Sequence, residues 1–375
     1  MANNESLPLN GIRVLDLSRV LAGPLCSMML GDMGADVIKV ERAGAGDDTR
    51  GWGPPFHANG QSAYFLSTNR NKLSIATDFR LANDQALLQE LIQKADVVLE
   101  NFLPGALSRN GLDRSTLLEA NPQLIWCTIS GFGEQSTRPG YDFVVQAESG
   151  WMAITGPEHG APHKVAVALV DVIAGKDACI AILAALAGRH RPRAAVDRAL
   201  HISLQKSAAA ALVNVAQNAL VTGQPPRRWG NAHPNLVPYQ LFEAADGPFV
   251  IAVGSDSQWH SAVSVLRLQE LADNRTLDTN AGRLAHRDLI VEAISNAVRS
   301  EPSAGWVKRL EAAGVPCGTV RGVLEALTEV AASPETGVGP ATGGSVRLPP
   351  PRLDEHGALI RKLHWSAFKV VPILG

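Results

Sequence analysis

The feature that most restricts the fold is an alternation of short apolar runs with longer helical patterns over about the first 130 residues. Ile12 to Leu17 (IRVLDL) has the composition of a buried strand, and Asp36 to Val40 (DVIKV) that of a second one. Further elements are predicted as a helix over Leu25 to Met33, strands at Leu73 to Ile75, Val97 to Leu99 and Leu124 to Ile129, and a helix over Asn83 to Lys94. This rhythm predicts a doubly wound, Rossmann-like α/β domain, in which helices cover both faces of a parallel sheet.

One break divides the remainder of the chain. Gly223 to Pro238 is rich in Pro, Gly and Asn, and such a composition is typical of a domain boundary. The elements predicted around it are a turn at Val170 to Gly175, a helix over Lys176 to Arg189, a strand at Ala199 to Leu204, a helix over Lys206 to Thr222, a strand at Phe249 to Val253, and helices over Trp259 to Leu266 and Arg287 to Val298. We predict a large α/β domain over residues 1–200, a helical linker over 201–228, a smaller α+β domain over 229–325 and a C-terminal segment over 326–375.

The composition excludes several classes of protein. Hydrophobic residues make up 46% and charged residues 19%, which is the balance of a globular enzyme. The net charge of -2 provides no overall field for nucleic acid or an anionic membrane. The most apolar stretch, Ala178 to Ala187, is far shorter than the ~20 residues of a membrane span. The four cysteines form no C-x-x-C pair, so we expect a soluble, cytoplasmic protein with reduced thiols and no metal site.

The first strand–helix–strand unit resembles a dinucleotide-binding fold only superficially. That fold needs G-x-G-x-x-G, so that the backbone can approach a pyrophosphate. Here the turn between strand and helix contains one glycine, Gly23, followed directly by Pro24. An NAD site is therefore not expected.

A series of motifs instead resembles one enzyme family along nearly the whole chain. The motifs are, in order, VLDLSRVLAGP, GDMGADVIKVER, NRNK, VLENFLPGALSRNGLD, SGFGE, YDFVVQAESGWMAITG, GNAHPNLVPYQLF and AGVPCG. Together they resemble the class III CoA-transferases, the superfamily that includes formyl-CoA transferase, carnitine CoA-transferase and α-methylacyl-CoA racemase. The resemblance implies an enzyme that moves coenzyme A from an acyl-CoA to a carboxylic acid. It also implies an interlocked, ring-like homodimer and a C-terminal segment that returns to the large domain.

Asp171 matches the position of the family's nucleophilic aspartate. The pattern alone leaves a second interpretation open, because Asp is also a favoured helix N-cap. The resemblance implies that Asp171 attacks the thioester, forming an aspartyl anhydride and then an aspartyl-CoA thioester. No tightly bound cofactor is implied, since CoA and acyl-CoA are substrates. Backbone N–H groups of Ser130 to Gly133 or Gly230 to Pro238 are candidates for stabilising the oxyanion.

The resemblance also implies a set of CoA contacts. Guanidinium groups suit phosphates, and an aromatic ring can stack on adenine, although a surface arginine is often merely solvated and a phenylalanine at a strand end is often core. The positions that match family contacts are Val20, Leu21, Arg42, Thr77, Arg80, Asn101, Phe102, Arg109, Gly131 and Phe132. Trp229, His233 and Tyr239 are candidates for shaping the acyl pocket.

Other functions remain open at this point. The related racemases pair the aspartate with a histidine, because racemisation needs two bases on opposite faces of the α-carbon. This chain has Tyr141 where they have that histidine, which disfavours a racemase. A CoA lyase, a CoA-ester hydrolase and a non-catalytic CoA-binding protein are further alternatives. The segment GNAHPNLVPYQ resembles transferases that act on dicarboxylates more than it resembles formyl-CoA transferases, and this resemblance implies succinyl-CoA as donor.

Overall fold

The structure is a computed structural model that describes residues 6–374. Within these residues the chain divides into two compact units. The first comprises residues 6–152, 164–224 and 330–374, and the second comprises residues 153–163 and 225–329. The second unit is therefore inserted into the chain of the first.

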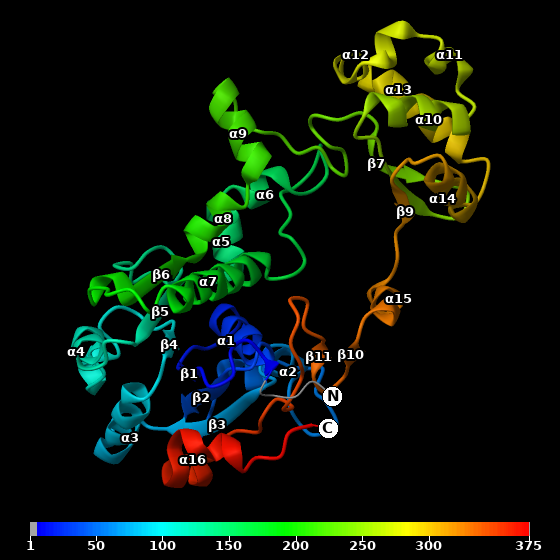
Figure 1. The fold of residues 1–375 in the computed structure, drawn as a ribbon. Helices are drawn as coiled ribbons and strands as arrows, with labels where there is room; N and C mark the ends of the chain where they lie inside the picture. The colour runs from blue at the N-terminus through cyan, green and yellow to red at the C-terminus, as the bar shows by residue number, and fades with distance from the viewer. Residues whose placement is uncertain (1–5, 375) are drawn as a thin grey trace. The chain divides into compact units, whose positions relative to one another are not determined.

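The first unit is built on a six-stranded parallel sheet with the order β3-β2-β1-β4-β5-β6 (Figure 1). Its strands are β1 (Arg13–Asp16), β2 (Asp36–Arg42), β3 (Lys72–Thr77), β4 (Val97–Glu100), β5 (Ile125–Ser130) and β6 (Ala199–Ser203). This is the strand order of doubly wound nucleotide-binding folds. The order reverses between β1 and β4, which lie side by side and pair in parallel, with Val14 opposite Val97.

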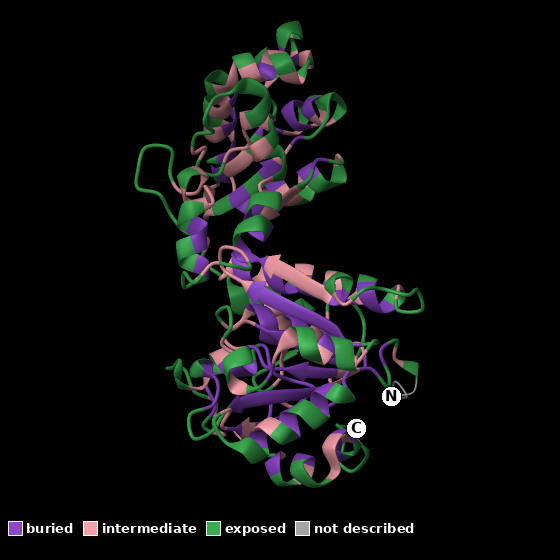
Figure 2. Ribbon diagram, turned by 90° about the vertical axis from the view of Figure 1, so that its left-hand side faces the viewer, coloured by how far each residue is buried: buried purple, intermediate pink, exposed green. Residues whose placement is uncertain are grey.

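Both faces of the sheet are buried, and each belongs to its own hydrophobic core. Successive residues of a strand point to opposite faces. In β4, accordingly, Val97 and Leu99 lie in one cluster and Val98 in the other. The central strand β4 is buried throughout and β1 is buried from Val14 on, whereas the edge strand β6 is mostly half-buried (Figure 2).

Helices α1 (Ala22–Asp32) and α7 (Leu169–Ala187) cover one face, and α3 (Ala82–Gln93) and α16 (Gly357–Leu363) cover the other (Figure 1). Gly175 of α7 lies against α1 so closely that a Cβ there would be 2.6 Å from the carbonyl oxygen of Ala22. Only glycine permits this contact. The other helices of the first part of the chain are α2 (Ala63–Leu66), α4 (Arg114–Ala120), α5 (Asp142–Glu148), α6 (Trp151–Ile154), α8 (Leu204–Ala210) and α9 (Val213–Thr222).

The second unit has a separate core around a three-stranded antiparallel sheet of order β7-β8-β9. The strands are β7 (Tyr239–Glu243), β8 (Pro248–Ala252) and β9 (Cys317–Thr319). The helices are α10 (Asp256–Val265), α11 (Gln269–Ala272), α12 (Asn280–Ala285), α13 (Arg287–Val298), α14 (Ser303–Ala312) and α15 (Val323–Ala326). A two-stranded ribbon, β10 (Ala332–Ser333) with β11 (Gly337–Val338), follows in the first unit.

Three predictions differ from the structure. The turn predicted at Val170 to Gly175 is wrong, because α7 begins at Leu169. The single helix predicted over Lys206 to Thr222 is broken into α8 and α9, where Val213 has a φ of 40°. The contacts also group residues 153–163 with the second unit and residues 201–224 with the first, which differs from the predicted division into domain and linker.

The C-terminal segment is fastened to the first unit by a buried polar cluster. Arg70 makes an ion pair with Asp32, at 2.7 Å between Nη2 and Oδ2, and donates to the carbonyl oxygens of Thr336 and Val338. The side-chain oxygen of Asn71 accepts from the backbone N–H groups of both Arg347 and Leu348. Backbone groups of residues far apart in sequence are thus satisfied by two neighbouring side chains.

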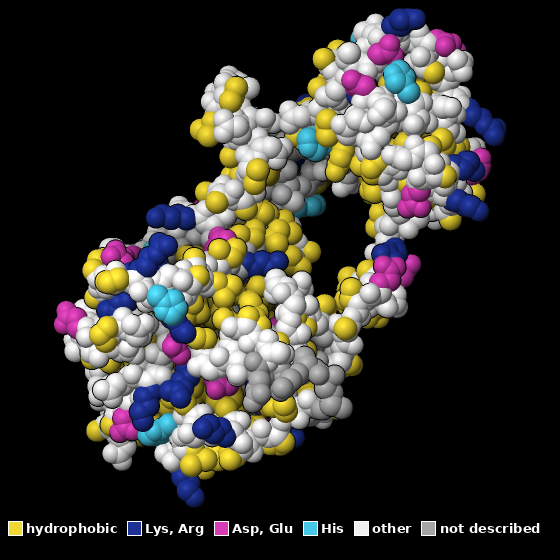
Figure 3. All heavy atoms as spheres, viewed as in Figure 1, with side chains coloured by type: hydrophobic (Ala, Val, Ile, Leu, Met, Phe, Trp, Pro, Cys, Tyr) yellow, Lys and Arg dark blue, Asp and Glu magenta, His cyan; other side chains and the backbone are white. Residues whose placement is uncertain are grey.

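Basic and acidic side chains are interspersed on the face of the molecule shown in Figure 3. Among residues 6–374, no helix combines the length and the apolar character that a membrane crossing requires.

Replacing Arg70 by Met tests the anchoring of the C-terminal segment. The substitution leaves the Asp32 carboxylate buried with its charge partner removed, so we expect a loss of about 3–5 kcal/mol in the free energy of unfolding. Urea denaturation followed by circular dichroism measures the change. Arg321→Met is the matched control, since its ion pair with Glu329 is solvent-exposed and its loss should leave the midpoint nearly unchanged. Equal midpoints for the two variants would contradict this prediction.

Candidate active site

A cavity of about 500 Å³ lies in the first unit, at the edge of the sheet where the parallel strands end. Its wall includes the segments that follow β1, β4 and β5, together with Asp171 near the start of α7. The loops after β1 and β4 flank the point at which the strand order reverses. In open α/β sheets, ligands bind in the crevice at this point.

The two loops at the crevice are fastened to each other. The backbone N–H of Arg19 donates to Oδ1 of Asn101 at 3.0 Å, and Nδ2 of Asn101 donates to the carbonyl oxygen of Arg19 at 2.8 Å. Both residues line the cavity. Asn101 therefore holds the two sides of the crevice together, a role that depends on an amide with both a donor and an acceptor.

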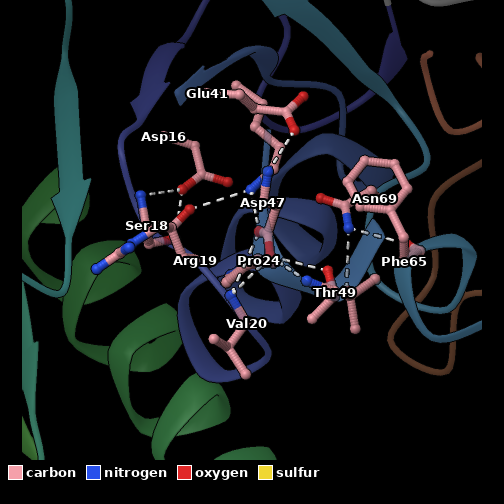
Figure 4. Close-up of polar contacts among 12 residues, drawn as sticks. Asp16, Ser18, Arg19, Val20, Pro24, Glu41, Asp47, Thr49, Phe65 and Asn69 are labelled. Carbon is pink, nitrogen blue, oxygen red and sulfur yellow. Dashed lines mark hydrogen bonds and ion pairs between the residues drawn. The ribbon is translucent and has the colours of Figure 1, made fainter. Parts of the chain in front are cut away.

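The loop after β1 is held in a strained conformation by a buried carboxylate, that of Asp47. Val20 lines the cavity with a φ of 73°, a value that is unusual for a β-branched residue. Its backbone N–H donates to both carboxylate oxygens of Asp47, each at 3.3 Å, and Asp47 also accepts from Thr49 (Figure 4). Nζ of the fully buried Lys39 lies 2.9 Å from Oδ2 of Asp47. A buried ion pair thus fixes the backbone that forms one wall of the cavity.

Asp171 is the third residue of α7 and has a side chain that is nearly buried, with 9% exposure. No hydrogen bond from residues 6–374 reaches its carboxylate. Burial, together with the charge of Asp142, raises the pKa of Asp171 to about 7. The ionised form is therefore present near neutral pH but is poorly stabilised by its surroundings.

Asp142 performs the capping role that the sequence left open for Asp171. One of its carboxylate oxygens accepts from the backbone N–H of Val170 at 2.8 Å, and the other accepts from Nε2 of Gln146 at 2.7 Å. These bonds fix the Asp142 carboxylate beside the first turn of α7. Asp171 itself makes no capping bond to residues 6–374 and forms part of the cavity wall.

The loop after β5 packs backbone to backbone against the segment before α5. A Cβ on Gly131 would be 2.5 Å from the Cα of Gly140, and both glycines line the cavity. Oγ of Ser130 accepts from the N–H of Gly133 at 3.1 Å and lies 2.9 Å from Nε2 of His201. Burial, the largest influence, lowers the pKa of His201, which favours the neutral ring at neutral pH.

An aromatic ring and a guanidinium group form another part of the wall. The Phe102 ring is half-buried, with its centroid 5.8 Å from that of Phe79. The guanidinium carbon of Arg19 lies 5.3 Å from the centroid of the same ring. Nε of Arg19 is buried and has no hydrogen-bond partner among residues 6–374. The arrangement offers a flat apolar surface beside a cation with an unused donor.

The predicted site residues fall into two groups. Asp171, Val20, Leu21, Asn101, Phe102 and Gly131 all line the cavity. The residues that the structure places outside its wall are Arg42, Thr77, Arg80, Arg109 and Phe132.

Most of this second group lies close to the cavity wall. Nη2 of Arg42 is 3.5 Å from Oδ1 of the wall residue Asp48. In the parallel pairing of β2 with β3, Arg42 lies opposite Thr77 at the end of both strands. Arg109 approaches Gly105 of the wall, and Phe132 packs beneath the guanidinium of Arg138 at 4.1 Å. The side chain of Arg80 is highly exposed and makes an ion pair with Asp78, at 2.7 Å between Nη2 and Oδ2.

Seven charged residues of the wall were not predicted from the sequence: Arg19, Asp48, Glu100, Asp113, Arg114, Glu134 and Arg138. Burial raises the pKa of Glu100, whose carboxylate accepts from the N–H of Phe102 at 2.8 Å. Glu100 precedes Asn101 and Phe102 in the ENF motif, and Arg19 follows Ser18 in the first motif, so both lay within the quoted motifs. The sequence held no signal for their contacts.

Trp229, His233 and Tyr239 all belong to the second unit. The rings of His233 and Tyr239 are 5.1 Å apart between centroids, and the N–H of His233 donates to the carbonyl oxygen of Tyr239. Trp229 is contacted by the guanidinium groups of Arg227 and Arg287. Within residues 6–374, no three His, Cys, Asp or Glu side chains are grouped so as to hold a metal ion.

The chain is similar to known proteins over most of its length. The model of CoA-transferase family III matches residues 9–350. Succinyl-CoA:glutarate CoA-transferase of Mus musculus is 43% identical over 327 residues, which is 86% of this chain and 74% of that protein. Succinate--glutarate CoA-transferase of Agrobacterium fabrum is 42% identical over 330 residues, covering 86% of this chain and 82% of that protein.

A solved structure gives the same answer for the fold. The crystal structure of a CAIB/BAIF family protein from Brucella suis has a TM-score of 0.81 and 38% sequence identity, covering 94% of this chain and 98% of that chain. The matched family, the relatives and the crevice geometry agree with the motifs in the sequence. The chain belongs to the class III CoA-transferase family.

Proposed function

We propose that the protein transfers CoA from an acyl-CoA to a carboxylic acid, with Asp171 as the covalent nucleophile. The observation that carries this proposal is a buried carboxylate without a hydrogen-bond donor, on the wall of a cavity at the crevice of the sheet. The names of the relatives, which are CoA-transferases, support the reaction class. The match of CoA-transferase family III to residues 9–350 supports the same reaction class.

In the proposed reaction, CoA passes between the two substrates by way of the Asp171 carboxylate. The Asp171 carboxylate attacks the thioester carbonyl, and the C–S bond breaks to give an aspartyl mixed anhydride and the CoA thiolate. The thiolate then attacks the aspartyl carbonyl of the anhydride, releasing the donor acid as its carboxylate and leaving CoA on Asp171 as a thioester. An acceptor carboxylate repeats these two steps in reverse and leaves as the new acyl-CoA.

The surroundings of Asp171 make its carboxylate more reactive than it would be in water. An unpaired, desolvated carboxylate next to the charge of Asp142 is unstable as an ion, and acylation removes that charge. The backbone N–H groups after β5, around Gly131 and Gly133, are the candidate donors to the oxyanion of each tetrahedral intermediate.

CoA is expected to enter at the crevice between the β1 and β4 loops. Phe102 would stack on the adenine, and the partly exposed guanidinium of Arg19 lies beside that ring as a candidate partner for a phosphate, where it would compete with Asp48 at 3.7 Å. We propose Val20, Leu21, Asn101 and Gly131 as further contacts of the CoA arm. We propose that the predicted residues beyond the cavity wall contact the outer part of the CoA molecule: Arg42, Thr77, Arg80, Arg109 and Phe132.

We also propose succinyl-CoA as donor and a short dicarboxylate such as glutarate as acceptor. The proposal rests on the names of the relatives at 43% and 42% identity and on two arginines, Arg114 and Arg138, in the wall of the cavity. The distal carboxylate of such a substrate would compete for Arg114 with Glu134, whose Oε1 lies 2.7 Å from Nη2 of Arg114.

A homodimer is part of the same proposal. Ile180 on α7 and Leu220 and Val221 on α9 are 64%, 78% and 75% exposed. Large apolar side chains exposed to this extent favour burial against a second chain.

The covalent role of Asp171 can be tested by trapping. Incubation with succinyl-CoA followed by hydroxylamine should convert Asp171 to its hydroxamate, which peptide mass spectrometry detects. Asp171→Asn should lower transfer to glutarate by at least roughly 10³-fold and abolish the label. Asp177→Asn, a substitution in the same helix, is the matched control and should keep both activity and label.

Two outcomes would contradict the proposal. Labelling of another residue, or none, with an active donor would remove Asp171 from its role. Exchange of a substrate α-proton with solvent, without transfer of CoA, would indicate a racemase instead.

The raised pKa of Asp171 predicts a stability difference that depends on pH. Its pKa is 3.8 in the unfolded reference and about 7 in the folded protein, so the folded state binds the extra proton between these values. The wild-type protein therefore loses stability as pH rises from about 4 to 7. Asp171→Asn removes this loss and should stabilise the protein at pH 8 by about 4 kcal/mol in order of magnitude, and much less at pH 4. Chemical denaturation at the two pH values measures the difference, and an equal effect at both would contradict the pKa assignment.

A further inference from the structure

A second cavity of the first unit, of about 340 Å³, lies near the carboxyl end of α7 and has no function in the proposed reaction. It shares no wall residue with the active-site cavity. Its wall contains four arginines and one histidine and, among residues 6–374, no Asp or Glu: Arg189, His190, Arg191, Arg193 and Arg198. We call these five residues the basic hollow.

Arg198 is the fixed cation of the basic hollow. It has 7% exposure, and its two Nη atoms donate to the carbonyl oxygens of Leu118, Asn121 and Leu124 at 2.7, 2.8 and 3.0 Å. These acceptors orient the guanidinium but carry no net charge. Nε is buried and has no partner among residues 6–374. Among residues 6–374, Arg198 is thus a buried charge without a counterion, which is an unfavourable state for a cation.

The arginines at the rim of the hollow are also short of counterions. Asp96 lies 3.6 Å from Arg189. Within residues 6–374, no carboxylate oxygen lies within 4.0 Å of the guanidinium groups of Arg191, Arg193 or Arg198. The Arg193 guanidinium rests against the last turn of α7, where a Cβ on Gly188 would be 2.4 Å from Nη2. The carbonyl end of a helix attracts a cation there, but it holds only about half an elementary charge.

We propose that the basic hollow binds a small, multiply charged oxyanion of the phosphate or carboxylate type. Such an anion neutralises several cations that the fold holds together, and guanidinium groups match its oxygens with paired donors. The cavity volume of about 340 Å³ leaves room for an anion larger than a single phosphate. This site is separate from the reaction cavity, so it can be occupied while CoA is bound.

Calorimetric titration of the whole protein with pyrophosphate, at constant ionic strength and with CoA at saturation, tests this site. Saturating CoA occupies any phosphate-binding groups of the active-site cavity, so the remaining heat reports on the basic hollow. We expect pyrophosphate to bind under these conditions. Citrate added as a competitor shows whether the site accepts carboxylates as well as phosphates, since a polycarboxylate that binds there displaces pyrophosphate.

Variants locate the binding. Replacing both Arg191 and Arg193 by Ala should weaken pyrophosphate binding by roughly tenfold or more, because two charge-assisted contacts are lost. Both side chains are exposed, so the fold should be retained. Arg275→Ala with Arg299→Ala removes the same charge from exposed positions in the second unit and should leave binding unchanged. Absence of binding in the wild type, loss of binding on adding CoA, or equal weakening in both double variants would overturn the proposal.

Discussion

The close contact between helices α1 and α7 is the constraint from which the arrangement of the site follows. Gly175 allows α7 to lie directly on the backbone of α1 at Ala22. Helix α1 begins immediately after the loop that carries Val20, and α7 carries Asp171 one turn before Gly175. Because the two helices are in close backbone contact at this point, the loop after β1 and the Asp171 carboxylate lie at the same cavity. A side chain at position 175 would separate them.

The site also shows how buried charges are divided between two tasks. The Lys39 and Asp47 pair is neutral as a whole, and Asp47 accepts further hydrogen bonds from Val20 and Thr49, so the pair can hold the strained backbone of Val20. Asp171 is the opposite case, since burial raises its pKa and no hydrogen-bond donor from the described part of the chain, residues 6–374, compensates. An enzyme keeps such a group at the expense of stability when the reaction uses it. The proposed nucleophile is therefore recognisable by its missing bonds as well as by its position.

The sheet was predictable because each strand is a short apolar run between helical patterns, and burial on both faces requires that composition. The motifs also pointed to Asp171, Asn101 and Phe102, which the structure places in the wall of one cavity. The start of α7 was predicted incorrectly because the bond that begins the helix comes from Asp142, some thirty residues earlier in the chain, so no local signal marks Leu169 as the first helical residue. Arg19 was missed for a similar reason, since its place beside Phe102 depends on the adjacency of β1 and β4. Sequence patterns indicate elements well, but contacts between distant segments depend on the assembled sheet.

The route of the chain through its two units has a consequence for the order of events during synthesis. Arg70 and Asn71 leave the ribosome early, but the backbone groups that satisfy them lie at Thr336, Val338 and Leu348. Closing a loop of more than 250 residues is slow. Until the C-terminal segment has docked, the surface beside β3 that it covers in the folded protein stays open to water and to other chains. The second unit, by contrast, is almost continuous in sequence and can complete its own core first. We would therefore expect nascent chains of this enzyme to be vulnerable to aggregation at the β3 edge, and to depend on chaperones for longer than a protein of equal size without an inserted unit.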